Sequence, residues 1–216
     1  MGIKLPILGK YPLDTIPYEE VEAFIKTNED KLGVAFCNLT EINAEQCKTT
    51  NEFYAACHAA SVIGTLQAGY TSFPYLGKIT EEIVKQEALI GVSITGWMNN
   101  PMLFNAEILQ TGAQVVKLAN QRIAKMIGIN QAARTTTVKP SGNASVILGT
   151  ASGIHPEHSQ RYFRIMQLNK ENDTAKWLEK NMPYLLEDSF WSTTNSDYVV
   201  YVPIENPAEG LYKKDV

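Results

Sequence analysis

The residues between positions 135 and 149 have the composition of a site for an anion. They read TTTVKPSGNASVILG, a β-rich run that ends at Pro140 and leads into a short apolar helix. The first turn of a helix leaves backbone N–H groups without partners and carries partial positive charge. Gly142 lets the backbone approach a ligand closely, and the hydroxyls of Ser141 and Ser145 can donate further hydrogen bonds. The stretch therefore predicts a local site for a nucleotide phosphate.

The same residues also fit an ordinary helix start. Ser141 would then be the N-cap residue, and its hydroxyl would accept a hydrogen bond from the first turn. A Ser-Gly-x-x-Ser pattern is common and only weakly specific. Composition alone leaves both interpretations open.

The three cysteines are the next candidates for chemistry. Cys37 lies in a predicted strand, where a buried cysteine is usually inert packing. Cys47 and Cys57 fall on one predicted helix, where a rise of ~1.5 Å per residue separates them by about 15 Å along the axis. A disulfide needs Cα atoms within roughly 7 Å, so this pair is not expected to form one. Both are expected to be packing residues.

Two of the three histidines, His155 and His158, are close enough in sequence to suggest a metal pair. No further histidine or cysteine lies near them to complete a ligand set, and Pro156 disfavours a helix that would carry both rings on one face. We therefore expect no metal site.

Alternating strand and helix patterns must position these residues. Strands are predicted at residues 32–39, 89–95, 134–138, 164–168 and 198–202. Helices are predicted at residues 18–27, 45–70, 105–127 and 173–180, with a shorter one that begins near Thr80 as its N-cap. This alternation favours an α/β fold with a mostly parallel sheet or part of a barrel, in one domain over residues 1–216.

Composition excludes several classes of function. The chain has 216 residues and a net charge of −4, so no basic excess points to nucleic acid or to an anionic membrane. No apolar run is long enough to span a bilayer, and the N-terminus has no signal-peptide core. Three cysteines are too few for a disulfide scaffold, which favours a reducing cytoplasm.

Three stretches together resemble one protein family. They are CNLTEIN at residues 37–43, IGVSITG at 90–96, and TVKPSGNAS at 137–145 with its continuation SGIHP at 152–156. Their order and spacing resemble the C-terminal half of the barrel in ribonucleotide reductases, nearest to the adenosylcobalamin-dependent ribonucleoside-triphosphate reductases. The resemblance covers residues 33–206 and leaves residues 1–32 as a divergent N-terminal extension.

The resemblance implies a fold and a set of site residues. The family fold is a ten-stranded α/β barrel, of which this chain would form one half with about five largely parallel strands. The Pro-Ser-Gly-x-x-Ser turn of the family holds the substrate phosphates, and Cys37 resembles one of the two active-site thiols that supply reducing equivalents. The residues that take the phosphate role by this resemblance are Ser141, Gly142, Asn143, Ala144 and Ser145, with Asn143 standing where the family more often has threonine.

The family's radical-bearing cysteine, which precedes the Cys37 strand in an Asn-x-Cys-x-Glu motif, has no counterpart here because residues 1–36 contain no cysteine. The resemblance therefore implies a split enzyme that is inactive alone. Complementary reductase fragments would supply the radical cysteine, adenosylcobalamin would be the cofactor, and an external thiol would be the reductant. The implied reaction turns ribonucleoside triphosphates or diphosphates into 2′-deoxyribonucleotides for DNA replication, in the cytoplasm, or in the host cytoplasm if the protein is viral.

Two other functions are compatible with the residues. One is a self-contained phosphate-binding α/β protein without radical chemistry, and the other is a non-catalytic assembly subunit. The residues also leave open a diphosphate or a triphosphate substrate, an inactive remnant of the enzyme, and a radical source in a separate metal-containing subunit.

Overall fold

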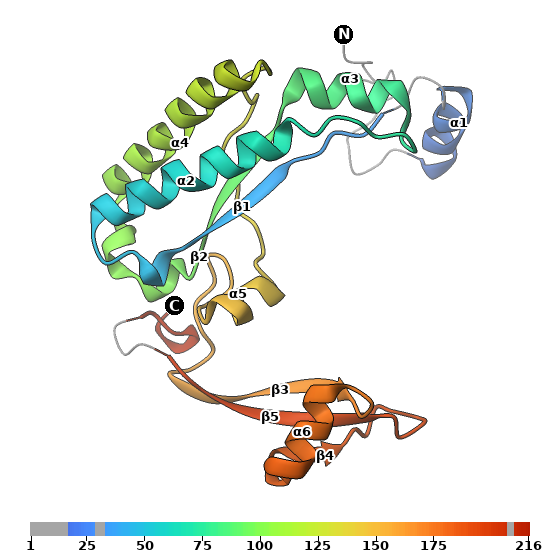
Figure 1. Ribbon diagram of the computed structural model, residues 1–216, viewed down its shortest axis with the longest axis vertical. Coiled ribbons are helices and arrows are strands. Elements are labelled where there is room, and N and C mark those ends of the chain that lie inside the picture. Colours follow the sequence, from blue (N-terminus) through green and yellow to red (C-terminus); the bar gives the residue numbers. More distant parts are fainter. Residues whose placement is uncertain (1–16, 29–32, 207–209) are drawn as a thin grey trace. The chain divides into compact units, whose positions relative to one another are not determined.

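The computed structural model describes residues 17–28, 33–206 and 210–216 (Figure 1). Its α-helices are α1 (Tyr18–Asn28), α2 (Thr50–Ala68), α3 (Gly77–Glu87), α4 (Ala106–Ile127), α5 (Asn143–Leu148) and α6 (Asp173–Asn181). Its strands are β1 (Asn38–Asn43), β2 (Ile90–Thr95), β3 (Arg161–Asn169), β4 (Leu186–Asp188) and β5 (Asp197–Glu205). The predicted helices at 18–27, 105–127 and 173–180 are confirmed with shifts of one residue at their ends, whereas the helix predicted at 45–70 begins only at Thr50.

The chain divides into two compact units. Unit 1 contains Met1–Thr40, His58–Val92 and Ala113–Thr137, and unit 2 contains Glu41–Cys57, Ser93–Gly112 and Val138–Val216. The single domain over residues 1–216, with an extension at 1–32 and a family-like part at 33–206, stays a prediction.

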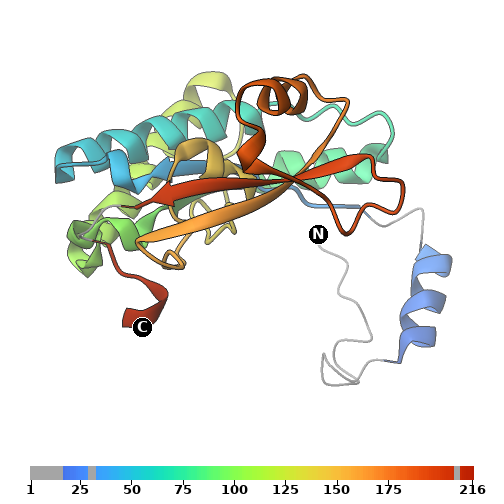
Figure 2. The same ribbon diagram turned by 90° about the horizontal axis from the view of Figure 1, so that it is seen from below.

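In unit 1, the parts of α2 and α4 that belong to it lie side by side (Figures 1 and 2). Buried hydrogen bonds join them: the Ser61 hydroxyl donates to the Val116 carbonyl at 2.7 Å, and the Asn120 amide donates to Thr65 Oγ1 at 2.9 Å. The Asn120 carbonyl oxygen also accepts from the backbone N–H of Ala132 at 3.0 Å. These bonds fix the chain that leaves α4. No helix in the described part of the chain is long and apolar enough to cross a bilayer.

β1 and β2 form a two-stranded sheet, and the segment that follows α4 extends it. Val92 N donates to Thr135 O and Thr137 N donates to Val92 O, each at 3.0 Å, and Val92 pairs in parallel with Thr136. The predicted strand at residues 134–138 is therefore present as a segment paired with β2, although it is not a regular strand.

Two local predictions are wrong. The strand predicted at residues 32–39 begins only at Asn38, so Cys37 lies just before β1. The apolar run before Cys37 suggested an earlier start, whereas the pairing begins where Asn38 N donates to Leu89 O at 3.0 Å. Thr80 is not an N-cap, because α3 begins at Gly77 and the buried Thr80 hydroxyl accepts from Val34 N instead.

Unit 2 contains an antiparallel sheet with the strand order β3-β5-β4. Its register runs from Arg161 opposite Glu205 to Asn169 opposite Asp197. Helix α6 lies beside this sheet, with the Tyr198 hydroxyl donating to Glu179 at 2.7 Å (Figures 1 and 2). The expectation of largely parallel strands is wrong for β3 and β5, and β4 was not expected from the sequence. The helix between β3 and β5 suggested a crossover connection, but the chain returns through β4 and pairs antiparallel.

Candidate active site

The predicted phosphate loop lies in unit 2, between residue 139 and helix α5 (Figure 1). Its first residues are fixed by side chains of β1 and β2. The buried Ser93 hydroxyl accepts a hydrogen bond from Lys139 N at 3.0 Å. The fully buried Thr95 hydroxyl lies 2.9 Å from the Ser141 hydroxyl.

Glu41 is the centre of this arrangement. One of its carboxylate oxygens pairs with the Lys139 ammonium group. The other accepts hydrogen bonds from the hydroxyls of Ser141 and Thr95, the latter at 2.7 Å. The Glu41 side chain is only 11% exposed, so the carboxylate is held largely out of water. We call Glu41, Thr95, Lys139 and Ser141 the Glu41 cluster.

The charge of this carboxylate is stabilised in spite of its burial. Burial acts to raise the pKa of Glu41, but hydrogen bonds from Lys139, Ser141 and Thr95 and the charge of Lys139 act against it. Together they hold the pKa of Glu41 below its ordinary value. At neutral pH the Glu41 carboxylate and the Lys139 ammonium group therefore form an ion pair.

The far side of the loop is supported by residues 152 and 153. Gly142 N donates to the Ser152 hydroxyl at 3.2 Å. A Cβ on Gly153 would lie 2.8 Å from the Lys139 carbonyl oxygen, so the two segments pack with no room for a side chain. Since Gly153 also has a φ of +57°, glycine is required there on two grounds.

Gly142, and not Ser141, is the N-cap residue of α5. Its φ of 50° and ψ of −128° lie in a region that side chains with a Cβ rarely adopt. The Ser141 hydroxyl makes no capping bond, because it is engaged by Glu41 and Thr95. The alternative in which Ser141 caps an ordinary helix is therefore wrong.

The remaining loop residues differ in what they can offer to a ligand. The Ser145 hydroxyl is buried and donates to the Gly142 carbonyl at 2.7 Å, and Ala144 N donates to the Ser141 carbonyl at 3.0 Å. Gly142 and Asn143 are exposed, and a Cβ built on Gly142 meets no atom within 4 Å. The open side of the loop is thus at its glycine and asparagine, while both serine hydroxyls are used within the protein.

Cys37 lies in unit 1 beside a glycine that makes room for it. A Cβ on Gly91 of β2 would lie 2.7 Å from the Cys37 Sγ, 2.7 Å from Leu39 Cδ2 and 2.8 Å from Thr137 Cγ2. Cys37 is a free, exposed cysteine, and partial burial raises the pKa of its thiol. The thiol is therefore accessible and protonated at neutral pH.

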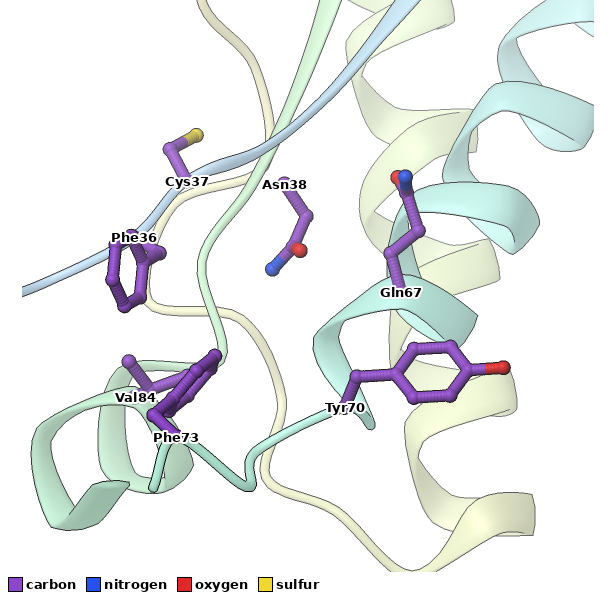
Figure 3. A pocket seen from close by; sticks show the side chains of 7 residues that line it. All are labelled: Phe36, Cys37, Asn38, Gln67, Tyr70, Phe73 and Val84. Carbon is purple, nitrogen blue, oxygen red and sulfur yellow. The ribbon is translucent and has the colours of Figure 1, made fainter. Parts of the chain in front are cut away.

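A cavity of about 380 Å³ lies next to Cys37 in the same unit (Figure 3). The rings of Phe36 and Phe73 pack in it with their centroids 5.1 Å apart. Figure 3 shows the Cys37 sulfur pointing away from these rings, as expected where successive side chains of an extended segment alternate in direction. Cys37 is nevertheless one of the residues that line this cavity.

Cys47 and Cys57 are buried free cysteines of unit 2. Cys47 precedes α2 and is not on the helix with Cys57, so the helical spacing expected for this pair is wrong. Burial, with a smaller contribution from Cys47, raises the pKa of Cys57 to about 12. Both thiols have the surroundings of packing residues.

The residues that sequence reasoning missed are those that hold the loop. Glu41, Ser93 and Thr95 received no role, although each is a polar residue in a strand. In β2, polar residues at alternate positions of a buried strand were a usable signal, because such groups need hydrogen-bond partners. No group of three or more His, Cys, Asp or Glu side chains that could hold a metal occurs among residues 17–28, 33–206 and 210–216.

Comparison with known proteins finds similar proteins, although no family model matches the chain. The chain is 24% identical over 152 residues to the adenosylcobalamin-dependent ribonucleoside-triphosphate reductase of Euglena gracilis. It is 25% identical over 147 residues to a probable enzyme of the same name from Dictyostelium discoideum. These matches cover 68% and 66% of this chain. The chain is a homologue of these reductases.

This chain spans about a fifth of the length of these two curated relatives, 20% and 18% respectively. Its fold is also similar to a crystal structure of a B12-dependent class II ribonucleotide reductase, with a TM-score of 0.62 and 19% identity. That match covers 82% of this chain and 29% of the reductase chain. The predicted resemblance to the adenosylcobalamin-dependent reductases is confirmed, and the low coverage fits a fragment.

Proposed function

We propose that this chain is one piece of a split ribonucleotide reductase, which holds the substrate phosphates and supplies one redox thiol. The observation that carries the proposal is the construction of the 139–145 loop. Its start is fixed by the Glu41 cluster, while Gly142 and Asn143 remain exposed. A loop that is rigid at its base and open at its glycine suits a ligand that binds through backbone N–H groups.

In this proposal the phosphate site consists of Ser141, Gly142, Asn143, Ala144 and Ser145. The backbone N–H of the exposed Asn143 would face phosphate oxygens, because the Gly142 N–H already donates to the Ser152 hydroxyl, and the Asn143 amide could add a side-chain donor. Ser141 and Ser145 would contribute through the shape of the loop, since their hydroxyls already have partners. The substrate would be a ribonucleoside triphosphate or diphosphate.

Cys37 would be the redox thiol. Its accessibility and its raised pKa suit a group that gives up hydrogen as a neutral thiol and not as a thiolate nucleophile. In the proposed reaction a thiyl radical abstracts the 3′ hydrogen of the ribose, the 2′ hydroxyl leaves as water with a proton from a thiol, and the thiyl cysteine finally returns a hydrogen to the 3′ carbon. Cys37 and a second thiol are then oxidised to a disulfide, which an external thiol reduces again.

The rest of the machinery would come from complementary reductase fragments. In this proposal the partner supplies the radical cysteine. β1, β2 and the segment paired with β2 would be part of one half of the family barrel, which the partner completes. We place the complex in the cytoplasm, or in the host cytoplasm if the protein is viral.

Adenosylcobalamin would be the cofactor, and it supplies the radical when bound. Three cavities lined by described residues have volumes of about 380, 230 and 250 Å³. A corrin ring with its nucleotide loop and adenosyl group exceeds a drug-sized ligand, for which pockets span roughly 300–1,000 Å³. None of these three cavities fits it, so we propose that the cofactor contacts mainly the partner chain.

The proposal is tested by reconstitution. The full chain is expressed with and without a neighbouring reading frame that encodes an Asn-x-Cys-x-Glu motif, and deoxyribonucleotide formation is measured with adenosylcobalamin and a dithiol. We expect no product from the chain alone, product from the complex, and loss of multiple turnover in the complex with Cys37→Ser. Product from the isolated chain, or full turnover by the Cys37→Ser complex, would overturn the proposal.

A further inference from the structure

We infer that Glu41 is a positioning residue of the phosphate loop, which sets the site by holding the hydroxyl of Ser141 and does not touch the substrate. The inference rests on the proposed function of the loop. It assigns a role to a residue that carries no part of the radical chemistry.

The contacts of the carboxylate support this role. Glu41 lies on β1, whereas Lys139 and Ser141 flank Pro140 at the start of the loop, almost 100 residues further along the chain. One carboxylate oxygen engages the ammonium of Lys139 and the other the hydroxyl of Ser141. The two residues that flank Pro140 are thus held by one carboxylate.

Burial makes these contacts hard to replace by contacts with water. Thr95 is completely buried, Ser141 is 4% exposed, and the Glu41 side chain is 11% exposed. Water cannot readily replace a partner in such a place, so a missing acceptor would leave buried hydroxyls unsatisfied. Without Glu41 the hydroxyls of Ser141 and Thr95 have only each other, so one of them loses its acceptor and the backbone that leads to Gly142 is no longer held in place.

The arrangement also explains how a carboxylate can stand beside an anion site. On charge alone, Glu41 would repel a phosphate. The pairing with Lys139 cancels that charge, and the bonds from Ser141 and Thr95 occupy the second oxygen. The carboxylate therefore fixes the position of the loop and adds little repulsion of the phosphate.

These two effects predict opposite signs for one substitution. Glu41→Gln removes a negative charge and releases the Lys139 cation, so a purely electrostatic role predicts tighter phosphate binding. A positioning role predicts weaker binding, because the amide cannot accept the same set of hydrogen bonds while it faces the Lys139 donor. The direction of the change in affinity separates the two.

The experiment measures the affinity of CTP, CDP and cytidine for the assembled complex by calorimetric titration. We expect Glu41→Gln to weaken CTP and CDP by about tenfold or more, the order of a lost charge-assisted hydrogen bond, and to leave cytidine within twofold. Glu171→Gln is the matched control, since it removes a lysine-paired carboxylate of the same unit at an exposed position. It should leave all three affinities unchanged.

A double-mutant cycle tests whether Glu41 acts through Ser141. Ser141→Ala should weaken CTP as Glu41→Gln does, and the double variant should be no weaker than either single one. Wild-type complex that does not bind CTP would overturn the proposed function itself. Wild-type binding with unchanged or tighter binding by Glu41→Gln would overturn only the positioning role, as would strictly additive effects in the cycle.

Discussion

Replacing Gly142 with alanine should separate the stability of the loop from its affinity for phosphate. The native backbone at this position has a φ of 50° and a ψ of −128°, where a residue with a Cβ is strained by about 1–3 kcal/mol. The alanine also lowers the entropy of the unfolded chain, which offsets about 0.4–1 kcal/mol of that strain. The added Cβ meets no protein atom within 4 Å, so no steric clash adds to this.

The net loss is therefore on the order of 1–2 kcal/mol. In a protein of this size 1 kcal/mol lowers Tm by about 2–4 °C, so a fall of about 2–8 °C is expected in a thermal melt. Affinity should fall further than stability suggests, because the Cβ would occupy the space of the ligand or shift the N–H groups that face it. Each such bond is worth about 1.5–3 kcal/mol, or about tenfold to a hundredfold in Kd.

Gly149→Ala is the matched control. Gly149 ends α5 with a φ of 68° and a ψ of 34°, and a Cβ there also meets nothing within 4 Å. This left-handed conformation should cost alanine about 1–2 kcal/mol, and CTP affinity should stay within twofold. Unchanged affinity in the Gly142→Ala complex, or an equal loss in both variants, would refute the assignment of the loop as the phosphate site.

Three further results are expected. In the native chain a thiol reagent should label Cys37 first and reach Cys57 only after denaturation, because burial raises the pKa of Cys57 to about 12; equal rates read by mass spectrometry would contradict this. Gly91→Ala should lower the free energy of unfolding by about 1–3 kcal/mol, since its Cβ would press on Cys37 and Leu39, and should slow labelling of Cys37. Because the pKa of Glu41 is lowered on folding, its stabilisation is present above its unfolded pKa of about 4.3 and is lost as pH falls through the folded value. Denaturant unfolding should therefore separate wild type from Glu41→Gln at pH 7, and the difference should shrink as the pH falls below about 4.3; a constant difference would refute this.

Elements with a strong periodic pattern were predictable from the sequence. The stripe of apolar residues in α4 and the apolar run of β2 gave their ends to within a residue or two. Gly128, with a φ of 75°, follows the last residue of α4, and glycine adopts this conformation without strain. These features depend on neighbours in the chain, so local patterns are sufficient to find them.

Features that depend on distant partners were not predictable in the same way. Ser141 has the residue type and position of an N-cap, and only a carboxylate 100 residues earlier in the chain takes its hydroxyl away from that role. The pairing of β3 with β5 was missed for a similar reason. The intervening helix α6 is typical of a parallel crossover, and the short strand β4 that turns the chain back has only three residues.

β2 shows why a strand that looks simply apolar can serve two purposes. Ile90 and Val92 are buried hydrophobic residues of the core, as expected for a strand covered by helices. The residues between and beyond them, Gly91, Ser93 and Thr95, are small or polar, and each meets a partner that the proposal uses. Gly91 gives room to the Cys37 thiol, Ser93 accepts from the loop backbone, and Thr95 donates to Glu41. Packing alone would favour larger apolar side chains at these positions, so their type is better explained by what they support than by the stability of the sheet.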